Sequence, residues 1–288
     1  MSPTPIELRD IANVLRRDVL TMTLEAGAGH IGGSLSVVDV LSVLYWEAMR
    51  VNPERPQWED RDRLVLSKAH ASPALYAALA RRGYFDVKEL MTFRKLKSLL
   101  QGFPDMQRTP GIDASVGSPG QGLSIANGIA MAARMDRKQF RVYCLIGDGE
   151  AHEGQVWEAA MTAAHHGLDN VCAIVDRNMM MGDGSTEDIV ALAPLVEKWR
   201  TFNWHVVEVD GHNIEQLSAA FKEAASVKGR PTLVHAKTVK GKGVPFMESK
   251  PEWHDRRPVS YTHLRAHETL TPISYAVVCL KWGGGGGG

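Results

Sequence analysis

The stretch 145-LIGDGEAHEGQVWEAAMTAAHHGLDNVCAIVDRN-178 decides the fold of this chain. Together with the preceding FRVYC, it begins as a run of apolar, β-branched and aromatic residues, and it closes on a second apolar run, VCAIVDRN. Between the two runs, EGQVWEAAMTAAHHG has the residue spacing of an amphipathic helix. A strand, a helix and a strand in this order form a βαβ unit, whose two strands lie parallel.

The same alternation continues on both sides of this unit. Further strands are expected over residues 61–70, 205–211 and 231–239, and further helices over residues 8–22, 37–49, 72–84 and 214–229. The helix over 72–84 would have Ser72 as its N-cap and Pro73 in its first turn. We therefore expect an α/β fold: a mainly parallel sheet with helices on both faces, and ligands beyond the carboxyl ends of its strands.

The composition is that of an ordinary globular protein. Of the 288 residues 44% are apolar, and 33 basic side chains balance 33 acidic ones. The net charge thus gives no indication of a nucleic-acid or membrane partner. The three cysteines have no metal-ligand or paired spacing. The N-terminus does not resemble a signal peptide, and no apolar stretch approaches the roughly 20 residues that span a bilayer. We expect a cytoplasmic protein.

Residues 259–288 break with this composition. VSYTHLRAHET resembles the in-frame translation of a transposase adapter used in short-read sequencing, and ISYAV resembles the continuation of that adapter. The six terminal glycines resemble translated dark bases. We therefore expect residues 1–258 to form one domain and 259–288 to be a non-native tail, with the natural reading frame interrupted near Pro258. The alternative is a flexible glycine linker.

The tripeptide Gly-Asp-Gly occurs twice, and the first copy is expected to hold a ligand. Asp148 follows one predicted strand and Asn178 the next, and a βαβ crossover brings two such strand ends side by side. Carboxylate and amide oxygens are suitable ligands for Mg²⁺, together with water and phosphate oxygens. Gly147 and Gly149 would let the backbone approach a diphosphate, and a helix that begins near Glu150 would point its amides at it.

A simpler interpretation of either tripeptide is an ordinary turn. The position of Asn178 one crossover after Asp148 favours a ligand role for the first copy. The second copy, around Asp183, follows no strand, so we interpret Asp183 as a turn or helix-entry residue. His212 in the sequence DGHN could simply cap the helix that follows, and we do not include it in the site.

At these residues the chain resembles the thiamine-diphosphate-binding half of transketolase. Residues 145–178 are similar to the diphosphate motif of that family almost residue for residue, and the resemblance extends over 6–258. Other matching blocks, in the order of the family, are GHIGGSLS, LSKAHASPALYAAL, GSPGQGLSIANGIAMA, DGHN, KTVKGKG and EWH. The short start and the wording GHIGGSLS are similar to the separate N-terminal subunit found where transketolase is split into two chains.

The resemblance implies a cofactor and its ligands. Thiamine diphosphate would be bound through a divalent metal ion, Mg²⁺ or in its place Ca²⁺ or Mn²⁺. Asp148, Asn178 and the backbone carbonyl of Met180 would bind the metal, and Gly149 would pack against the diphosphate. The first two of these ligands agree with the interpretation of the strand ends.

The resemblance also implies three catalytic histidines and two cationic residues. His30 and His70 would face the thiazolium and handle the hydroxyl protons of the sugar, because the pKa of an unperturbed imidazole, about 6.5, is near the working pH. His254, Lys68 and Lys240 would reach the diphosphate or the bound substrate. Without the resemblance, simpler interpretations would be hydrogen-bonded loop histidines and solvated surface lysines.

Four further positions follow from the resemblance. Gly117 and Pro119, in the GSPGQG segment, would position the aminopyrimidine, and Glu153 would link two active sites across a dimer. Glu153 could also be an ordinary first-turn helix glutamate. Two of the residues depart from the family. Pro119 replaces a leucine and removes an amide donor, and Phe103 replaces a histidine that contacts the donor sugar.

The implied function is that of a transketolase N-terminal subunit, which transfers a two-carbon ketol unit from a ketose or its phosphate to an aldose or its phosphate. The glutamate that activates the aminopyrimidine lies on the second domain of the family, and nothing in 1–258 resembles that domain. We therefore expect a partner, a C-terminal transketolase subunit carrying the pyrimidine-binding domain, in a homodimer or heterotetramer. Two alternatives stay open: a condensing decarboxylase similar to deoxyxylulose phosphate synthase, and a noncatalytic assembly subunit.

Overall fold

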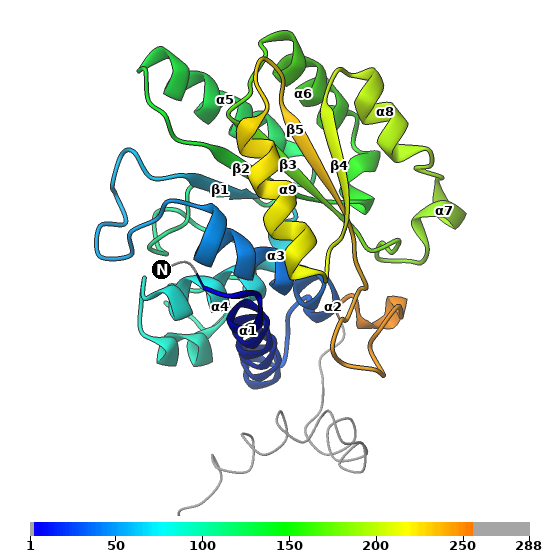
Figure 1. Cartoon of the computed structure of the whole chain (residues 1–288). Coiled ribbons are helices and arrows are strands. Elements are labelled where there is room, and N and C mark those ends of the chain that lie inside the picture. The colour runs from blue at the N-terminus through cyan, green and yellow to red at the C-terminus, as the bar shows by residue number, and fades with distance from the viewer. Residues whose placement is uncertain (1–2, 256–288) are drawn as a thin grey trace, which may run out of the picture.

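The structure, a computed structural model, describes residues 3–255. The interpretation of 259–288 as a non-native tail lies outside the described residues. The described residues contain a five-stranded sheet in the order β1-β2-β3-β5-β4, in which all neighbouring strands are parallel (Figure 1). The strands are β1 (Arg63–Leu66), β2 (Val142–Gly147), β3 (Val171–Arg177), β4 (His205–Asp210) and β5 (Thr232–Lys237).

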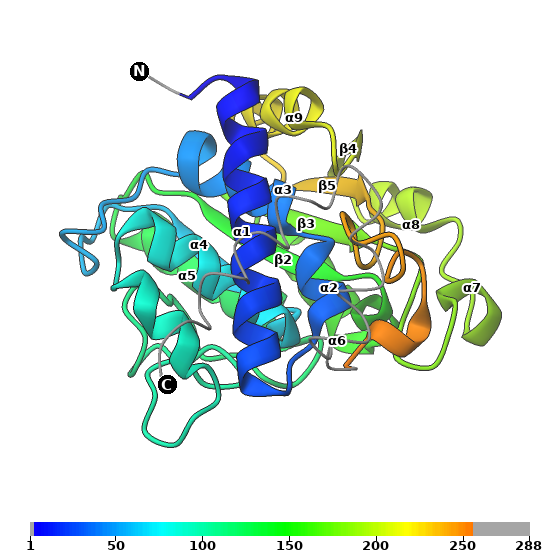
Figure 2. The same ribbon diagram turned by 90° about the horizontal axis from the view of Figure 1, so that it is seen from below.

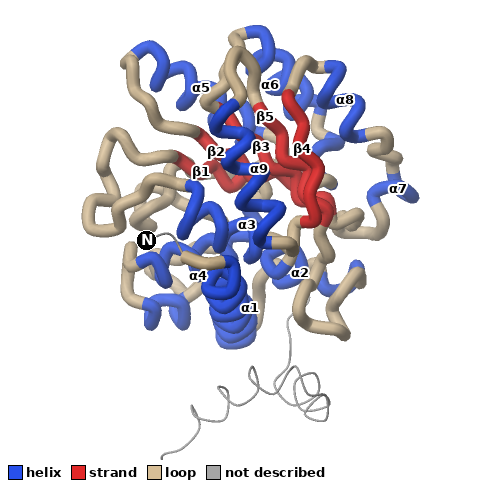
Figure 3. The backbone as a smooth tube through the Cα atoms, viewed as in Figure 1, coloured by secondary structure: helices blue, strands red, loops and turns tan. Residues whose placement is uncertain are grey.

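Side chains of each strand alternate between two hydrophobic cores, one on each face of the sheet. Along β2, for example, Tyr143 and Leu145 belong to one core, and Val142, Cys144 and Ile146 belong to the other. Helices cover both faces (Figure 3), which confirms the predicted α/β fold. On the first face lie α1 (Pro5–Ala26), α2 (Ile31–Leu35), α3 (Val38–Val43), α4 (Ser72–Arg82) and α9 (Ile214–Ser226). On the second lie α5 (Gln121–Met135), α6 (Gly154–His165) and α8 (Leu195–Thr201).

Helix α1 leads the chain to the first predicted catalytic loop. It begins with a capping box, in which the Thr4 side chain accepts from the Glu7 amide and the Glu7 carboxylate accepts from the Thr4 amide at 2.7 Å. Pro5 occupies the first turn, and Gly27 ends the helix in the left-handed conformation, with φ of 62°. Helix α1 lies between α4 and α2 in Figure 2, and His30 follows shortly after its end.

Two of the predicted helices differ in detail. Helix α4 includes Ser72 rather than being capped by it, because a 3₁₀ turn, Ala69–Ala71, precedes the helix. The Ser72 hydroxyl instead donates to the carbonyl of Gly102 at 2.8 Å. The predicted helix over 37–49 is present in two pieces, because a π-helical turn, Leu44–Ala48, follows α3.

The predicted helix start near Glu150 is wrong. A short 3₁₀ turn, Gly149–His152, follows the first Gly-Asp-Gly, and α6 begins only at Gly154. The α6 amides are therefore set back from the tripeptide. The second Gly-Asp-Gly is a bend, as predicted for Asp183, and it precedes the short helix α7 (Thr186–Ile189), whose N-cap is Ser185.

The strand register brings distant residues to one edge of the sheet. Gly147 of β2 lies opposite Asp176 of β3, so Asp148 and Asn178 emerge next to each other beyond the carboxyl ends of these strands. Strand β5 pairs with the other side of β3 and delivers Lys240, three residues beyond its end, to the same edge. This edge is where ligands bind in open parallel sheets.

Cys144 and Cys172 lie in strands as buried, free thiols, and they pack there as small hydrophobic residues. Burial raises the pKa of Cys172 to about 12, so its thiol stays protonated. Cys279 lies outside the described residues. Within residues 3–255, no helix is both long enough and apolar enough to cross a membrane.

The close approach of α5 to the loop after β1 predicts a stability difference between two glycines of α5. A Cβ atom on Gly122 would lie 2.4 Å from the Ser67 side chain, whereas a Cβ atom on Gly128 would have no neighbour within 4 Å. We expect Gly122→Ala to lower the free energy of unfolding by about 1–3 kcal/mol through overpacking. Gly128→Ala should raise it by up to about 1 kcal/mol through helix propensity. Urea unfolding midpoints measure both, and equal midpoints would contradict the packing.

Candidate active site

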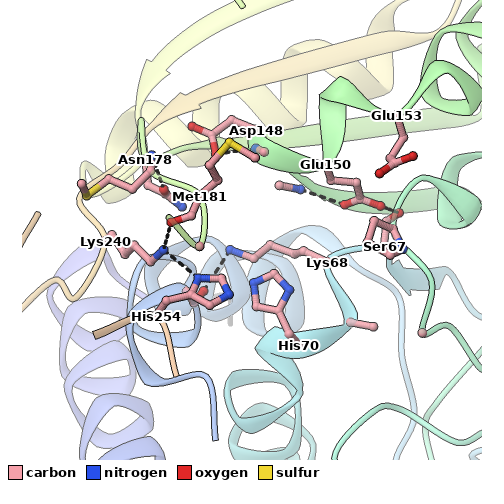
Figure 4. Close-up of a pocket in the computed structure, with 18 residues that line it drawn as sticks. Ser67, Lys68, His70, Asp148, Glu150, Glu153, Asn178, Met181, Lys240 and His254 are labelled. Atoms are coloured by element: carbon pink, nitrogen blue, oxygen red, sulfur yellow. Dashed lines mark hydrogen bonds between the residues drawn. The ribbon is translucent and has the colours of Figure 1, made fainter. Parts of the chain in front are cut away.

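A cavity of about 270 Å³ lies at the carboxyl edge of the sheet and brings together nearly all the predicted site residues (Figure 4). The predicted residues that line it are Lys68, His70, Gly117, Pro119, Asp148, Gly149, Glu153, Asn178, Met180, Lys240 and His254. His30 does not line the cavity but lies beside it, with its ring centroid 5.2 Å from those of His70 and His254. The structure thus places the predicted set in one site.

Asp148 is buried, and its carboxylate organises the loops that follow β2 and β3. Its Oδ1 accepts from the Gly149 amide at 2.8 Å, and its Oδ2 accepts from the Met179 amide at 2.6 Å. The guanidinium of Arg177 lies 3.2 Å from Oδ2. Burial and the negative charge of Asp176 raise the pKa of Asp148 to about 6, although Arg177 and the two amides oppose this shift. Asp148 is therefore ionised at neutral pH and has a cation beside it.

The oxygen atoms at this edge suit a hard divalent cation. Asp148, Asn178 and Met180 all line the cavity, and they carry a carboxylate, a side-chain amide oxygen and a backbone carbonyl. Asn178 Oδ1 accepts from the Met180 amide at 3.0 Å, so these two residues are held in one tight turn. In the part of the chain that the structure describes, no group of three or more His, Cys, Asp or Glu could hold a metal. A cation here would therefore need further oxygens, such as those of a diphosphate.

Three histidines form a triangle at the cavity. The ring centroids of His30, His70 and His254 lie 5.2–5.3 Å apart. Burial lowers the pKa of His30 and of His70. For His254, burial and the nearby charge of Lys240 lower the pKa to about 4. All three rings are therefore uncharged at neutral pH, and each has one nitrogen that donates and one that accepts. Such rings can exchange protons with sugar hydroxyls.

Two lysines of the site are buried but differ in their partners. Lys68 is 3% exposed and forms an ion pair with Asp176. Lys240 is 1% exposed, and its Nζ donates to His254 Nδ1 at 2.8 Å and to the Met181 carbonyl at 3.2 Å. Among the described residues, no carboxylate lies within ion-pair distance of Lys240. Burial and the charge of Lys68 lower the pKa of Lys240 to about 8. Lys240 is thus a buried cation with neutral partners, which favours binding of an anion.

Two acidic residues, Glu150 and Asp176, have roles at the site that were not predicted from the sequence. Glu150 accepts from the Ser67 hydroxyl, from the Gly120 amide at 2.7 Å and from the Gly147 amide at 3.0 Å. It therefore ties the GSPGQG loop to the end of β2, and burial raises its pKa. Asp176 is the buried partner of Lys68. The sequence did hold signals: an acid directly after Gly-Asp-Gly, and a charged residue inside an apolar strand.

The remaining predicted residues lie at the margin of the site. Gly117 and Pro119 line the cavity from the GSPGQG loop, and Gly120, with φ of +82°, brings that loop against the Glu153 side chain. Glu153 itself is exposed. Phe103 does not line the cavity, and 48% of it is exposed. The roles expected of these residues stay predictions.

His212 is neither a helix cap nor part of the cavity. Asn213 is the N-cap of α9, because its side chain accepts from the amide of Gln216. His212 Nε2 accepts from the Val239 amide at 2.8 Å, so Nδ1 carries the proton and donates to Asp39 at 2.8 Å. His212 therefore holds the segment after β5 in place.

A parallel α/β sheet whose carboxyl edge combines oxygen atoms suited to a cation with a buried ammonium is typical of domains that bind an anionic cofactor. A family model described as transketolase, thiamine diphosphate binding domain, matches residues 8–260. The chain belongs to this transketolase family. It is a transketolase-type transferase subunit with a thiamine-diphosphate-binding domain, as the sequence predicted.

Several relatives have similar length. The chain is 46% identical to the 6-deoxy-6-sulfo-D-fructose transketolase subunit of Clostridium sp. (strain MSTE9), over 89% of this chain and 94% of that protein. It is 38% identical to an apulose-4-phosphate transketolase subunit of Phocaeicola vulgatus, over 90% of this chain and 92% of that protein. Human transketolase is 40% identical over 86% of this chain, which spans 40% of that longer protein.

Solved structures agree with the family. The transketolase of Campylobacter jejuni superimposes with a TM-score of 0.83 at 34% identity, over 87% of this chain and 40% of that one. A transketolase from Pichia stipitis in complex with sedoheptulose-7-phosphate gives a TM-score of 0.85 at 30% identity, over 91% of this chain and 40% of that one. The chain therefore corresponds to one part of these longer transketolases.

The neutral state of His254 predicts a loss of stability in acid. Its pKa in the folded protein is about 4, below the ordinary 6.5, so the unfolded chain takes up this proton first. The contribution of neutral His254 to the free energy of unfolding is complete above a pH of about 6.5, and it is lost as the pH falls toward about 4. His254→Gln keeps a hydrogen-bond acceptor for Lys240 but does not titrate. Urea unfolding at several pH values should therefore show a smaller acid loss for the variant, and equal losses would contradict the shift.

Proposed function

We propose that this chain is the cofactor-binding half of a two-subunit transketolase. With Mg²⁺, thiamine diphosphate and a partner subunit, it transfers a two-carbon ketol unit from a ketose to an aldose. Bound thiamine diphosphate supplies the electron sink for cleavage of the carbon–carbon bond of the ketose. The residues of this chain bind the cofactor through its diphosphate end and present neutral imidazoles to the sugar.

One observation carries this proposal: an incomplete set of metal ligands shares one cavity with a buried ammonium whose described partners are neutral. Asp148, Asn178 and Met180 offer three oxygens, fewer than the six that Mg²⁺ prefers. Lys240 offers a positive charge without a carboxylate partner among the described residues. A diphosphate satisfies both requirements, because its oxygens complete the shell of the cation and its charge balances Lys240.

The histidine triangle supports a role in proton handling. His254 Nδ1 accepts from Lys240, so its proton resides on Nε2. His30 and His70 are neutral because burial and the nearby lysines disfavour their charged forms. A neutral ring can donate to one hydroxyl of a ketose and accept from another. We propose that these rings orient the sugar and move protons to and from its hydroxyls.

The proposal includes a partner chain with a pyrimidine-binding domain. The support is that three relatives of similar length are named as transketolase subunits, and that this chain spans 40% of full-length human transketolase. Glu153 is exposed beside the GSPGQG loop, which suits contact with another chain. We propose a heterotetramer or a homodimer, in the cytoplasm. Release of carbon dioxide from pyruvate would instead support the condensing decarboxylase.

We propose a ketose with a terminal anionic group as the donor. The relative that is 46% identical is named for 6-deoxy-6-sulfo-D-fructose, and two relatives that are 38% and 37% identical are named for apulose-4-phosphate. Both names contain an anionic substituent, and the higher identity makes the sulfo sugar the first donor to test. Phe103 supports an unusual donor, because a phenyl ring cannot form the hydrogen bond of the histidine usual there.

The two Gly-Asp-Gly copies provide a matched test of cofactor binding. Asp148→Asn should reduce the Mg²⁺-dependent affinity for thiamine diphosphate at least tenfold, on the order of the loss expected when a carboxylate ligand is removed. Asp183→Asn alters the exposed second copy and should bind as the wild type does. Isothermal titration of both variants and the wild type, with the partner subunit present, measures the affinities. No Mg²⁺-dependent binding by the wild type would overturn the proposed function and support the noncatalytic alternative.

Phe103 predicts a difference in donor specificity. Phe103→His should raise kcat/KM for an unmodified ketose phosphate relative to 6-deoxy-6-sulfo-D-fructose by about tenfold, the contribution of one hydrogen bond to the bound sugar. Phe103→Leu removes the ring without adding a donor, so it serves as the control and should not show this gain. Ketol transfer to a common aldose phosphate gives the comparison, and an equal gain for both variants would exclude a hydrogen-bonding cause.

A further inference from the structure

Asp176 is a buried carboxylate at the end of β3 that does not line the cavity. It is 1% exposed, yet it contacts side chains from four segments. Its Oδ2 accepts from the ammonium of Lys68, from the Ser36 hydroxyl at 2.8 Å and from Asn178 Nδ2 at 2.8 Å. Its Oδ1 accepts from the Thr238 hydroxyl. Asp176 therefore joins the loops that surround the carboxyl edge of the sheet.

The contact with Asp176 fixes the orientation of the Asn178 amide. An ionised carboxylate only accepts hydrogen bonds, so the Asn178 atom that faces it must be the nitrogen. On the other side, the Met180 amide only donates, so the atom that faces it must be the oxygen, 3.0 Å away. A flipped amide would place donor against donor and acceptor against acceptor. The two neighbours thus enforce one orientation, and Asn178 Oδ1 keeps a second lone pair for a cation.

The charge state of Asp176 is set by the same contacts. The Lys68 ammonium and the hydroxyl groups of Ser36 and Thr238 all donate to this carboxylate, which stabilises its charged form. Asp176 is therefore ionised at neutral pH. The carboxylate also holds the Lys68 ammonium, which lines the cavity. One buried residue thus determines the placement of a predicted metal ligand and of a predicted diphosphate contact.

We infer that Asp176 is a positioning residue for the binding of metal and thiamine diphosphate. It does not touch the cation itself but orients Asn178, so that the side-chain oxygen of Asn178 faces the cation. This inference rests on the proposed function of the cavity. A positioning role differs from a role that only neutralises the charge of Lys68, because neutralisation requires no more than a negative charge near Lys68. Positioning requires an acceptor directly against Asn178 Nδ2.

Exchange of the two side chains tests the contact between positions 176 and 178. Asp176→Asn leaves Lys68 with a neutral partner in either orientation of the new amide, and one of the two orientations also sets a donor against Asn178 Nδ2. Asn178→Asp sets a carboxylate against the carboxylate of Asp176. In the double variant, the amide nitrogen at 176 can donate to the carboxylate at 178, and this carboxylate must then also take over the pairing with Lys68, because Lys68 and Asn178 share Oδ2 of Asp176. The carboxylate at 178 can still accept from the Met180 amide and offer an oxygen to a cation. The total charge of the double variant equals that of the wild type.

The experiment measures Mn²⁺ binding in the presence of thiamine diphosphate, by electron paramagnetic resonance of free Mn²⁺, with the partner subunit present. We expect each single variant to bind Mn²⁺ about 10–100-fold more weakly, the usual effect of disrupting a residue that orients a metal ligand. The double variant should recover most of this loss, which would be a strongly non-additive result. Thr238→Val removes one contact of Asp176 without touching Asn178, so it should keep an affinity near that of the wild type.

The outcomes distinguish this inference from the proposed function. Single variants that bind Mn²⁺ like the wild type, or a double variant whose loss equals the sum of the single losses in free energy, would overturn the positioning role alone. A wild type that binds no Mn²⁺ with thiamine diphosphate would overturn both proposals. If the single variants do not fold, the folded double variant decides: near-normal Mn²⁺ affinity supports the role, and lost affinity contradicts it. Thermal unfolding establishes which variants are folded.

Discussion

The parallel pairing of β2 with β3 is the constraint on which the rest of the structure depends. This register sets Gly147 opposite Asp176, and the residues that follow the two strands therefore leave the sheet together. The Asp148 carboxylate then reaches the amide of Met179 across the gap between the strands. A slip of one residue would turn each side chain of a strand to the opposite face and would separate these atoms. The two apolar cores, which alternate along the strands, oppose such a slip.

Buried charge is the main cost of this arrangement. Asp148, Asp176, Lys68 and Lys240 are all at most 3% exposed, so each charge has been removed from water. The Lys68–Asp176 pair is compensated by additional hydrogen bonds, as a buried ion pair requires. Lys240 is less well compensated, and its lowered pKa expresses that deficit. The site is therefore electrostatically prepared for an anionic cofactor rather than for its own stability.

Much of the fold and of the site location could be predicted from the sequence, because they depend on local patterns. Apolar runs define the buried strands, and the positions of Asp148 and Asn178 at strand ends place them at one edge. Other features depend on contacts between distant segments. Ser72 lies inside α4 rather than at its N-cap, and its hydroxyl donates to the carbonyl of Gly102, thirty positions away. The hydroxyl of Ser36 that contacts Asp176 lies 140 positions away, and no residue spacing reveals it.

The charge and hydrogen-bonding states of the site residues also depend on contacts between distant segments, so the sequence alone does not predict them. The residue type of His254 makes it a candidate for proton transfer, but only its burial beside Lys240 makes it neutral. Likewise, the sequence shows that Lys68 and Lys240 carry positive charge, but only the structure shows that the first is paired with a carboxylate and that the second has neutral partners among the described residues. Residue identity therefore predicted which groups are candidates for the site, whereas packing decides the charge and the hydrogen-bonding state of each group.

The short 3₁₀ turn Pro251–Trp253 brings the last described residues of the chain to the site. The carbonyl of Trp253 lies so close to Gly32 that a Cβ atom there would be only 2.7 Å away, and His254 follows to meet His30 and Lys240. The histidine triangle thus joins residues from the two ends of the described chain. During synthesis the sheet could form before residue 251 is made, but the triangle could not. Residues up to 250 include the complete sheet, whereas the histidine triangle also requires residue 254.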